Sequence, residues 1–168
     1  MEKGVGIMDM VQATQKDFKV LYQILLECSN WLKSKGVPQW EKPYPAERFK
    51  SDIESGHVYY FVKFGQIVGM ATIQTAKPDY YPDNLFDDIK VWYVCRVAVP
   101  RKMKNRFLGQ QIFEVIQVEE KKSGIAALRI DIAETNPFLL DYYGNFGFVE
   151  LMRGTIFNKP TIFMEKRF

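Results

Sequence analysis

The sequence predicts an α/β fold in which a mixed, mostly antiparallel sheet forms one of three layers. The middle of the chain carries one strand–helix–strand unit, which runs from a nearly all-apolar segment at 91–99 to a second strand pattern at 127–133. The right-handed crossover rule makes these two strands parallel neighbours, or nearly so. Hairpin signals before and after the unit indicate antiparallel strands, so the sheet is expected to be mixed.

The first part of the chain predicts a strand followed by two helices. Thr14 and Asp17 have the spacing of a capping box, which opens a helix. Apolar side chains then recur at helical spacing up to Gly36. They are Leu21, Ile24, Leu25, Cys28, Trp31 and Leu32. A shorter helix is expected to begin after Pro45 and to end at Gly56.

A β-hairpin and a loop come next. Residues 57–64 and 67–76 are aromatic or β-branched runs, and the Gly65-Gln66 pair between them predicts the turn. Residues 78–88 have the prolines and aspartates of a loop. The apolar run at 91–99 then suits a central strand that is buried on both faces.

The C-terminal part alternates helices and strands. A helical stripe is formed by Leu108, Ile112, Val115, Ile116 and Glu119, and Gly124 closes that helix. A strand at 127–133 and a helix at 137–146 follow, and strands near 148–157 and 161–166 finish the chain. The predicted order is β, α, α, β, β, β, α, β, α, β, β.

The composition excludes several classes of protein. The chain has 168 residues, 47% of them hydrophobic, which suits one domain over 1–168. A net charge of +3 is too small to argue for binding to nucleic acid or membrane, and no apolar run is long enough to span a bilayer. The N-terminus lacks the apolar stretch of a signal peptide, so a cytoplasmic location is expected. Cys28, Cys95 and His57 have no metal-ligand spacing, so no metal is expected.

A cluster of cations follows the strand at 91–99. Residues 101–106 contain Arg101, Lys102, Lys104 and Arg106 and no acid. A helix begins directly afterwards, and the free N–H groups and positive dipole end of a helix start attract anions. This segment therefore predicts a diphosphate site, although a solvated basic turn would have the same composition.

Residues 94–148 resemble the cofactor-binding core of the GNAT superfamily of N-acetyltransferases. Residues 94–99, Val-Cys-Arg-Val-Ala-Val, match the end of that family's fourth strand, "hydrophobic-x-Arg-hydrophobic-Ala-Val". A gap-free alignment places Lys104, Phe107 and Gly109 on the three defining positions of the family's phosphate loop. These positions open the helix that binds the diphosphate in the family.

The same register extends to the end of this core. Asp131 ends the fifth strand, and Asn136, Tyr143 and Gly147-Phe148 fall on residues typical of the family. Upstream, Trp31-Leu32, Gln39-Trp40 and the hairpin at Gly65 resemble a bacterial GNAT branch with a Trp-Leu…Gln-Trp motif after its first helix. In this way the resemblance covers most of the chain.

The resemblance implies an enzyme that transfers an acetyl group from acetyl-CoA to a primary amine of a small molecule or peptide by direct attack, without a metal. The family's fourth and fifth strands splay apart, and the pantetheine arm pairs with the exposed backbone of the fourth. Tyr143 is then the general acid that protonates the CoA sulfur. The implied cofactor-binding residues are Val97, Ala98, Val99, Lys104, Asn105, Arg106, Phe107, Leu108, Gly109, Gln110, Asn136 and Tyr143.

One position departs from the family pattern. Phe107 stands where the family has a small residue, and it would be tolerated if its ring turned into the core and its φ were helical. A register shifted by two residues, Arg106-x-x-Gly109-x-Gln111, requires an insertion. The gap-free register is preferred because Leu108 and Ile112 then face the sheet. Phe107 also keeps an alternative open, a non-catalytic acyl-CoA-binding or regulatory module.

The acceptor side is less defined in the sequence. Residues expected to border the acceptor cleft are Trp40, Tyr44, Tyr80, Tyr81, Tyr93 and Cys95. An acidic, aromatic rim would suit a cationic amine, and a solvated loop would look the same. Tyr93, Cys95, Glu134 or a water relay could serve as general base, and Tyr93 and Cys95 are expected on the same side of their strand as Val97. A homodimer is possible, and no nucleic-acid partner is expected, because the basic cluster is local.

Overall fold

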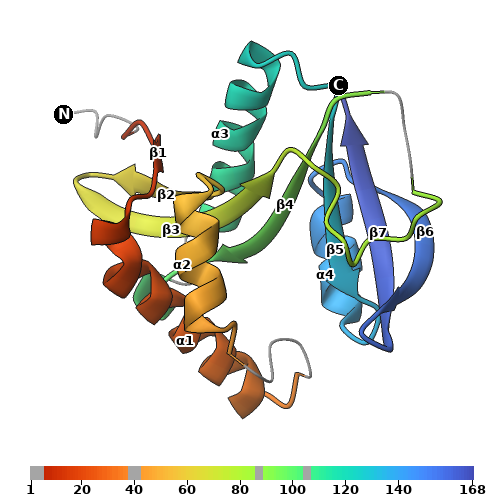
Figure 1. Ribbon diagram of the computed structural model, residues 1–168, viewed down its shortest axis with the longest axis horizontal. Helices are drawn as coiled ribbons and strands as arrows, with labels where there is room; N and C mark the ends of the chain where they lie inside the picture. The colour runs from red at the N-terminus through yellow and green to blue at the C-terminus, as the bar shows by residue number, and fades with distance from the viewer. Residues whose placement is uncertain (1–5, 38–42, 86–88, 104–106) are drawn as a thin grey trace.

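A single sheet organises the computed structural model, which describes residues 6–37, 43–85, 89–103 and 107–168. Within these residues, seven strands follow the order β1-β2-β3-β4-β5-β7-β6 (Figure 1). The strands are β1 (Asp9–Gln12), β2 (Val58–Lys63), β3 (Gln66–Gln74), β4 (Val91–Ala98), β5 (Ala127–Ala133), β6 (Val149–Ile156) and β7 (Lys159–Arg167). Neighbours are antiparallel except β4 and β5, which are parallel. The predicted mixed, mostly antiparallel sheet is confirmed.

Helices cover both faces of this sheet. They are α1 (Phe18–Ser34), α2 (Ala46–Glu54), α3 (Leu108–Lys122) and α4 (Pro137–Gly144). The apolar stripes of α1 and α2 pack on one face, whereas α3 and α4 pack on the other (Figure 1). The order of strands and helices is the predicted one. Among the described residues, no helix combines the length and the apolar composition needed to cross a membrane.

Local signals place the start of α1 and the first hairpin. The Thr14 N–H donates to Asp17 Oδ2 at 2.8 Å, as the capping box predicts, and the short 3₁₀ turn η1 (Gln15–Asp17) leads into α1. The hairpin turn lies one residue earlier than predicted. Phe64 and Gly65 both have positive φ, 51° and 70°. A two-residue turn whose twist matches that of the strands requires positive φ at both of its central positions.

The parallel contact between β4 and β5 is short. Only Val91–Tyr93 pair with 127–129. Beyond this point β4 continues to Ala98 and β5 to Ala133, and Figure 1 shows the two strands diverging. The splayed sheet implied by the family resemblance is therefore present, and it leaves the inner edges of both strands free of each other.

A β-bulge interrupts β4 just after the splay begins. On β3, Thr72 pairs with Cys95 and Met70 with Ala98, so β4 has one residue more than β3 between the two pairs. Arg96 takes up the irregularity with φ at +49°. As a result, Val97 packs with the core under α3, whereas Tyr93 packs in the cluster on the opposite face. The expectation that Val97 shares a side with Tyr93 and Cys95 was wrong, because the bulge breaks the two-residue alternation.

Candidate active site

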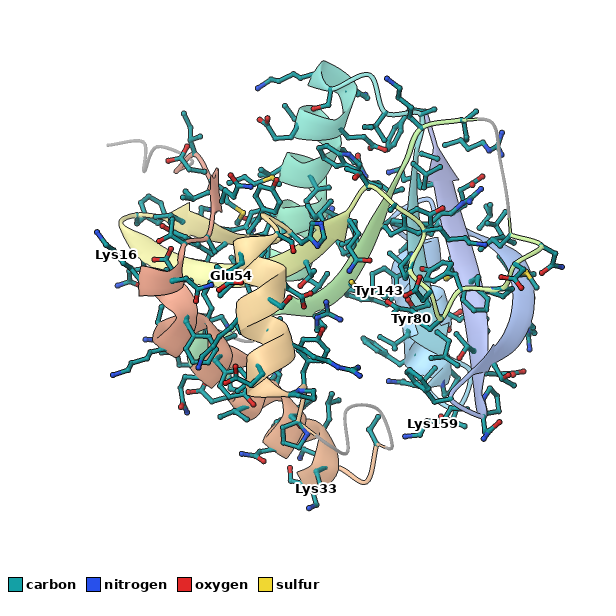
Figure 2. All side chains as sticks on the ribbon, in the orientation of Figure 1. Lys16, Lys33, Glu54, Tyr80, Tyr143 and Lys159 are labelled. Carbon is teal, nitrogen blue, oxygen red and sulfur yellow. The ribbon has the colours of Figure 1, made fainter. Side chains whose placement is uncertain are left out.

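Tyr143 lies on α4, where β4 and β5 part. Its ring makes edge-on contacts with Phe113 and Phe148, at centroid distances of 5.5 and 5.9 Å. Burial raises the pKa of Tyr143 well above its ordinary value, and the charges of Tyr142 and Asp131 raise it further. The phenol is therefore protonated at neutral pH and can donate a proton. Figure 2 labels Tyr143 and Tyr80, both of which lie between the lower part of β4 and β5 in that view.

The start of α4 presents an uncommitted amide. Asn136 occupies the N-cap position, Pro137 follows as the first helical residue, and the Asn136 side chain makes no capping hydrogen bond. In the register of the resemblance, Asn136 falls on an Asn typical of the family's cofactor site, and a role for it here stays a prediction. Its side chain is thus available to a ligand and is not consumed by the helix start.

The start of α3 is the predicted diphosphate site. Lys104, Asn105 and Arg106 lie outside the described residues, so the structure says nothing of their side chains. Leu108 and Ile112 are buried against the sheet, as the gap-free register requires. Gln110 is exposed and donates to Glu114 at 3.1 Å.

Phe107 does not take the conformation that the sequence suggested would make it tolerable. Its φ and ψ are 54° and 26°, in the left-handed region, and its ring is 80% exposed. The ring therefore points to solvent and not into the core. Glycine adopts this backbone conformation at little cost, which explains why a small residue suits the position, whereas a side chain adds roughly 1–2 kcal/mol of strain.

Gly109 allows α3 and α4 to approach each other. A Cβ at this position would collide with the Tyr142 hydroxyl. The Tyr142 ring is held in turn by Phe138 and Phe146, at centroid distances of 5.6 and 4.6 Å. The contact between the start of α3 and the last turn of α4 thus depends on the missing side chain.

Arg101 belongs to another part of the molecule than the sequence suggested. Its guanidinium lies 3.8 Å from the ring centre of Trp31 on α1, a cation–π contact. Nearby, the Cys28 thiol donates to the carbonyl of Val99 at 3.4 Å. These contacts attach α1 to the end of β4, so Arg101 serves that junction and not a ring of cations around the diphosphate.

A polar cluster lies beside the splay on the face of the sheet opposite Tyr143. The hydroxyl of Tyr81 donates to Asp131 Oδ2 at 3.2 Å, and Tyr80 interacts with the thiol of Cys95. Burial is the main cause that raises the pKa values of Tyr80, Tyr81 and Cys95. Burial also raises the pKa of Asp131 to about 6, although the Tyr81 hydrogen bond and the Arg96 charge oppose this.

Arg96 connects this cluster to α2. Its Nη2 donates to Asp52 Oδ2 at 3.0 Å, and its guanidinium lies 4.1 Å from the ring centre of Tyr44. The Tyr44 hydroxyl donates to the same Asp52 oxygen at 2.8 Å. The bulge that turns Arg96 toward α2 therefore places a paired cation next to the acceptor side of the splay.

A family model decides the classification of this fold and site. The model described as the acetyltransferase (GNAT) family matches residues 20–148. The chain belongs to the GNAT acetyltransferase family. A curated relative from Bacillus subtilis, described as the uncharacterized N-acetyltransferase YesJ, is 22% identical over an alignment of 142 residues, which covers 81% of this chain and 78% of the relative.

Solved GNAT structures share the fold. A GNAT-family acetyltransferase from Listeria monocytogenes has a TM-score of 0.82 at 21% identity and covers 96% of this chain and 95% of its own. The PaiA N-acetyltransferase from Thermoplasma acidophilum, in complex with coenzyme A, has a TM-score of 0.67 at 15% identity, with coverages of 96% and 99%. The Trp-Leu…Gln-Trp branch remains a prediction, since Trp40 lies outside the described residues.

The remaining sequence candidates occupy different places relative to the GNAT splay. Tyr93 is buried, and its hydroxyl accepts a bond from Arg129, which also forms a buried ion pair with Glu165. Glu134 lies just beyond β5 and pairs with Arg153 at 2.6 Å. Of the base candidates named from the sequence, Cys95 is the one in the polar cluster.

Asp131 was missed as a functional candidate in the sequence. In the sequence, Asp131 is noted only as the residue that ends the fifth strand. A usable signal was present, because Arg129 and Asp131 alternate with apolar residues and therefore share one face of β5. In the structure Arg129 is paired with Glu165, whereas Asp131 faces the splay.

Two further observations concern other ligands. Within the described ranges, no three His, Cys, Asp or Glu side chains gather so that they could hold a metal ion. An open cavity of about 970 Å³ lies between α1, β3 and the turn η2 (Arg101–Met103). Among the described residues that line it, none is a cofactor residue expected from the family register. We therefore take the divergence of β4 and β5 as the candidate site.

Proposed function

We propose that this protein transfers an acetyl group from acetyl-CoA to a primary amine of a small molecule or peptide by direct attack, with Tyr143 as general acid. The observation that carries the proposal is a protonated phenol located where β4 and β5 separate. The amine attacks the thioester carbonyl, and the sulfur leaves with the proton of Tyr143. A well-placed acid of this kind contributes roughly 10²- to 10⁴-fold in rate.

The backbone of β4 receives the pantetheine arm in this proposal. Val97 lies in the bulge and Ala98 and Val99 follow it, all beyond the last residue that pairs with β5. An extended ligand can hydrogen-bond to such an edge as an added strand. An N–H of this stretch would also polarise the thioester carbonyl. The diphosphate then lies at the start of α3, near 104–110, where free N–H groups and cations attract it.

Acceptor recognition is proposed on the opposite face of the sheet. Tyr80 and Tyr81 border Asp131 and Cys95 there. The exposed Phe157 at the turn between β6 and β7 contacts Tyr80 at a centroid distance of 6.4 Å. Aromatic rings next to a carboxylate suit an amine that arrives as a cation.

The role of Tyr143 is tested by Tyr143→Phe in a turnover assay against a panel of primary amines. We expect kcat to fall by about 10²- to 10⁴-fold while the Kd for acetyl-CoA is unchanged, because the ring packing is kept and only the proton donor is lost. Tyr142→Phe is the matched control on the same helix and should retain activity. Full activity of Tyr143→Phe would contradict the role of general acid.

A non-catalytic acyl-CoA-binding module is the second candidate function, and the left-handed, exposed Phe107 favours it. Binding of acetyl-CoA by the wild-type protein without turnover of any amine would support the module. Phe107→Gly separates the two further. It should relieve backbone strain and raise the free energy of unfolding by roughly 1 kcal/mol. If it also creates turnover that the wild type lacks, Phe107 is what prevents catalysis.

A further inference from the structure

The carboxylate of Asp131 lies directly at the mouth of the splay. Tyr93 and Arg129 are the last residues that β4 and β5 pair. Cys95 and Asp131 are the next residues on the same face of each strand, two positions further along. The two strands therefore present a thiol and a carboxylate on the acceptor face at the point where they separate.

The surroundings of Asp131 fix the orientation of its carboxylate. The Tyr81 hydroxyl donates to Oδ2 at 3.2 Å, and Tyr81 itself is packed against Tyr93 and Phe163. Phe163 is the cross-strand neighbour of Asp131 on β7 and is apolar. Asp131 is partly buried as a residue, and direct contact between its carboxylate and an incoming amine is part of the proposal.

Asp131 is also electrostatically coupled to Tyr143. Its negative charge contributes to the raised pKa of Tyr143, although the phenol belongs to α4 on the other face of the sheet. A proton that arrives on Asp131 removes this charge and makes Tyr143 a stronger acid. A proton acceptor and the proton donor thus communicate across the splay.

We propose that Asp131 is the general base that accepts the proton of the attacking amine, with Tyr81 as its positioning residue. This rests on the proposed acetyl transfer. The amine nitrogen forms its bond to the acetyl carbon and passes one proton to a carboxylate oxygen of Asp131. The bond between that carbon and the CoA sulfur breaks, and the sulfur takes the proton of Tyr143. Solvent then returns a proton to Tyr143 and removes one from Asp131.

The other candidates for the general base are either paired with another side chain or less suited to accept a proton. Glu134 is held by Arg153, and the Tyr93 hydroxyl accepts from Arg129. Burial raises the pKa of Cys95, so its thiol is protonated at neutral pH. By contrast, the pKa of Asp131, raised to about 6, leaves it ionised at pH 7 but more basic than an ordinary aspartate.

Among the described residues, several groups interact electrostatically with Asp131. These groups are Tyr80 and Tyr81 on the loop after β3, Cys95 and Arg96 on β4, and Tyr143 on α4. The charge of Arg96 and the hydrogen bond from Tyr81 both lower the pKa of Asp131. Loss of the Tyr81 hydroxyl should therefore move the titration of Asp131 to higher pH.

The test measures kcat from pH 5 to 9 on an amine that the wild type acetylates, for Asp131→Asn, Asp131→Glu and the matched control Glu134→Gln. We expect Asp131→Asn to lower kcat by about 10²- to 10⁴-fold at pH 7, without change in the Kd for acetyl-CoA. The loss should shrink toward pH 5, where wild-type Asp131 is itself protonated. Asp131→Glu should recover part of the rate, and Glu134→Gln should behave as wild type.

Tyr81→Phe supplies a second readout that does not require Asp131 to be replaced. In Tyr81→Phe, the acidic limb of the plot of kcat against pH should move to higher pH than in the wild type. The shape of the profile should stay the same. An active Asp131→Asn, a loss equal at all pH values, or an unmoved limb in Tyr81→Phe would overturn the role of Asp131 alone. Wild-type protein that binds acetyl-CoA but acetylates no amine would instead overturn the proposed function and the base role with it.

Discussion

Glu120 shows at the residue scale how burial controls a single ionisable group. Its side chain is fully buried on α3, and among the described residues neither carboxyl oxygen has a hydrogen-bond partner. Desolvation raises its pKa to about 8, and the nearby charges of Lys166 and Lys121 only partly oppose this. The folded protein therefore holds a proton on Glu120 at neutral pH.

This makes stability depend on pH with a definite sign. Between about pH 4.5 and about pH 8 the folded state keeps the proton and the unfolded state loses it. The free energy of unfolding should therefore fall as pH rises through this window, by at most about 1.4 kcal/mol per pH unit. Urea denaturation at pH 5 to 9 measures it, and Glu120→Gln should gain stability relative to wild type as pH rises.

The control for this prediction is one residue away. Glu119 lies on the solvent side of α3, where it pairs with Lys122 at 3.1 Å. Glu119→Gln should leave the slope of stability against pH as it is in the wild type. A constant stability difference between Glu120→Gln and wild type at all pH values would show that Glu120 is not protonated in the fold.

At the scale of elements, α3 and α4 meet through side chains, and these are the two helices to which we assign the cofactor. The start of α3 is to hold the diphosphate, and α4 carries Tyr143. Phe113 on α3 contacts Tyr143, and the Tyr142 hydroxyl occupies the space that a Cβ on Gly109 would take. In the proposed site, the distance between the two helices therefore sets how far Tyr143 lies from the diphosphate.

Gly109→Ala tests this helix contact. The added methyl group collides with the Tyr142 hydroxyl, so we expect weaker acetyl-CoA binding and a loss of roughly 1–3 kcal/mol in stability. Tyr142→Phe in the same chain should rescue both, because it removes the colliding oxygen. Gly144→Ala is the matched control, since a Cβ there meets no atom within 4 Å. Equal effects with and without the Tyr142 hydroxyl would exclude this mechanism.

At the scale of the whole molecule, the sheet consists of two parts that share one short parallel contact. β1 to β4 carry α1 and α2 on one face, and β5 to β7 continue beyond the splay (Figure 1). A ligand that enters the splay contacts both parts. Binding of such a ligand should therefore stabilise both parts of the sheet together. It should also protect the amides at the free edge of β4 from hydrogen exchange.

Hydrogen exchange followed by mass spectrometry can locate this protection. Acetyl-CoA should raise Tm and slow exchange at the amides of Val97 and Val99, because the pantetheine arm takes them as partners. Peptides that line the open cavity between α1 and β3, such as those with Val20 or Ile67, serve as the internal control. Protection confined to those peptides would place the ligand in the cavity and contradict the proposed site.

Much of the fold could be predicted because its signals are local. The periodicity of apolar residues located the helices and strands, and the crossover rule gave the parallel neighbours β4 and β5. The cofactor candidates followed from a register in which Gly109, Asn136 and Tyr143 keep fixed spacings. By itself, the sequence determined the order of elements, the fold class and the family resemblance.

Only the tertiary structure decided what depends on contacts between distant segments. The bulge at Arg96 reversed the side of Val97, because pairing with β3 and not local alternation sets the register there. Phe107 faces solvent in a left-handed conformation that no spacing reveals. Asp131 meets Tyr81, fifty positions away in the chain, and that meeting changes a strand-end residue into a candidate base. The pKa and the orientation of a side chain are set by the groups that surround it in space. Those groups come from distant parts of the chain, so their positions cannot be read from the order of residues.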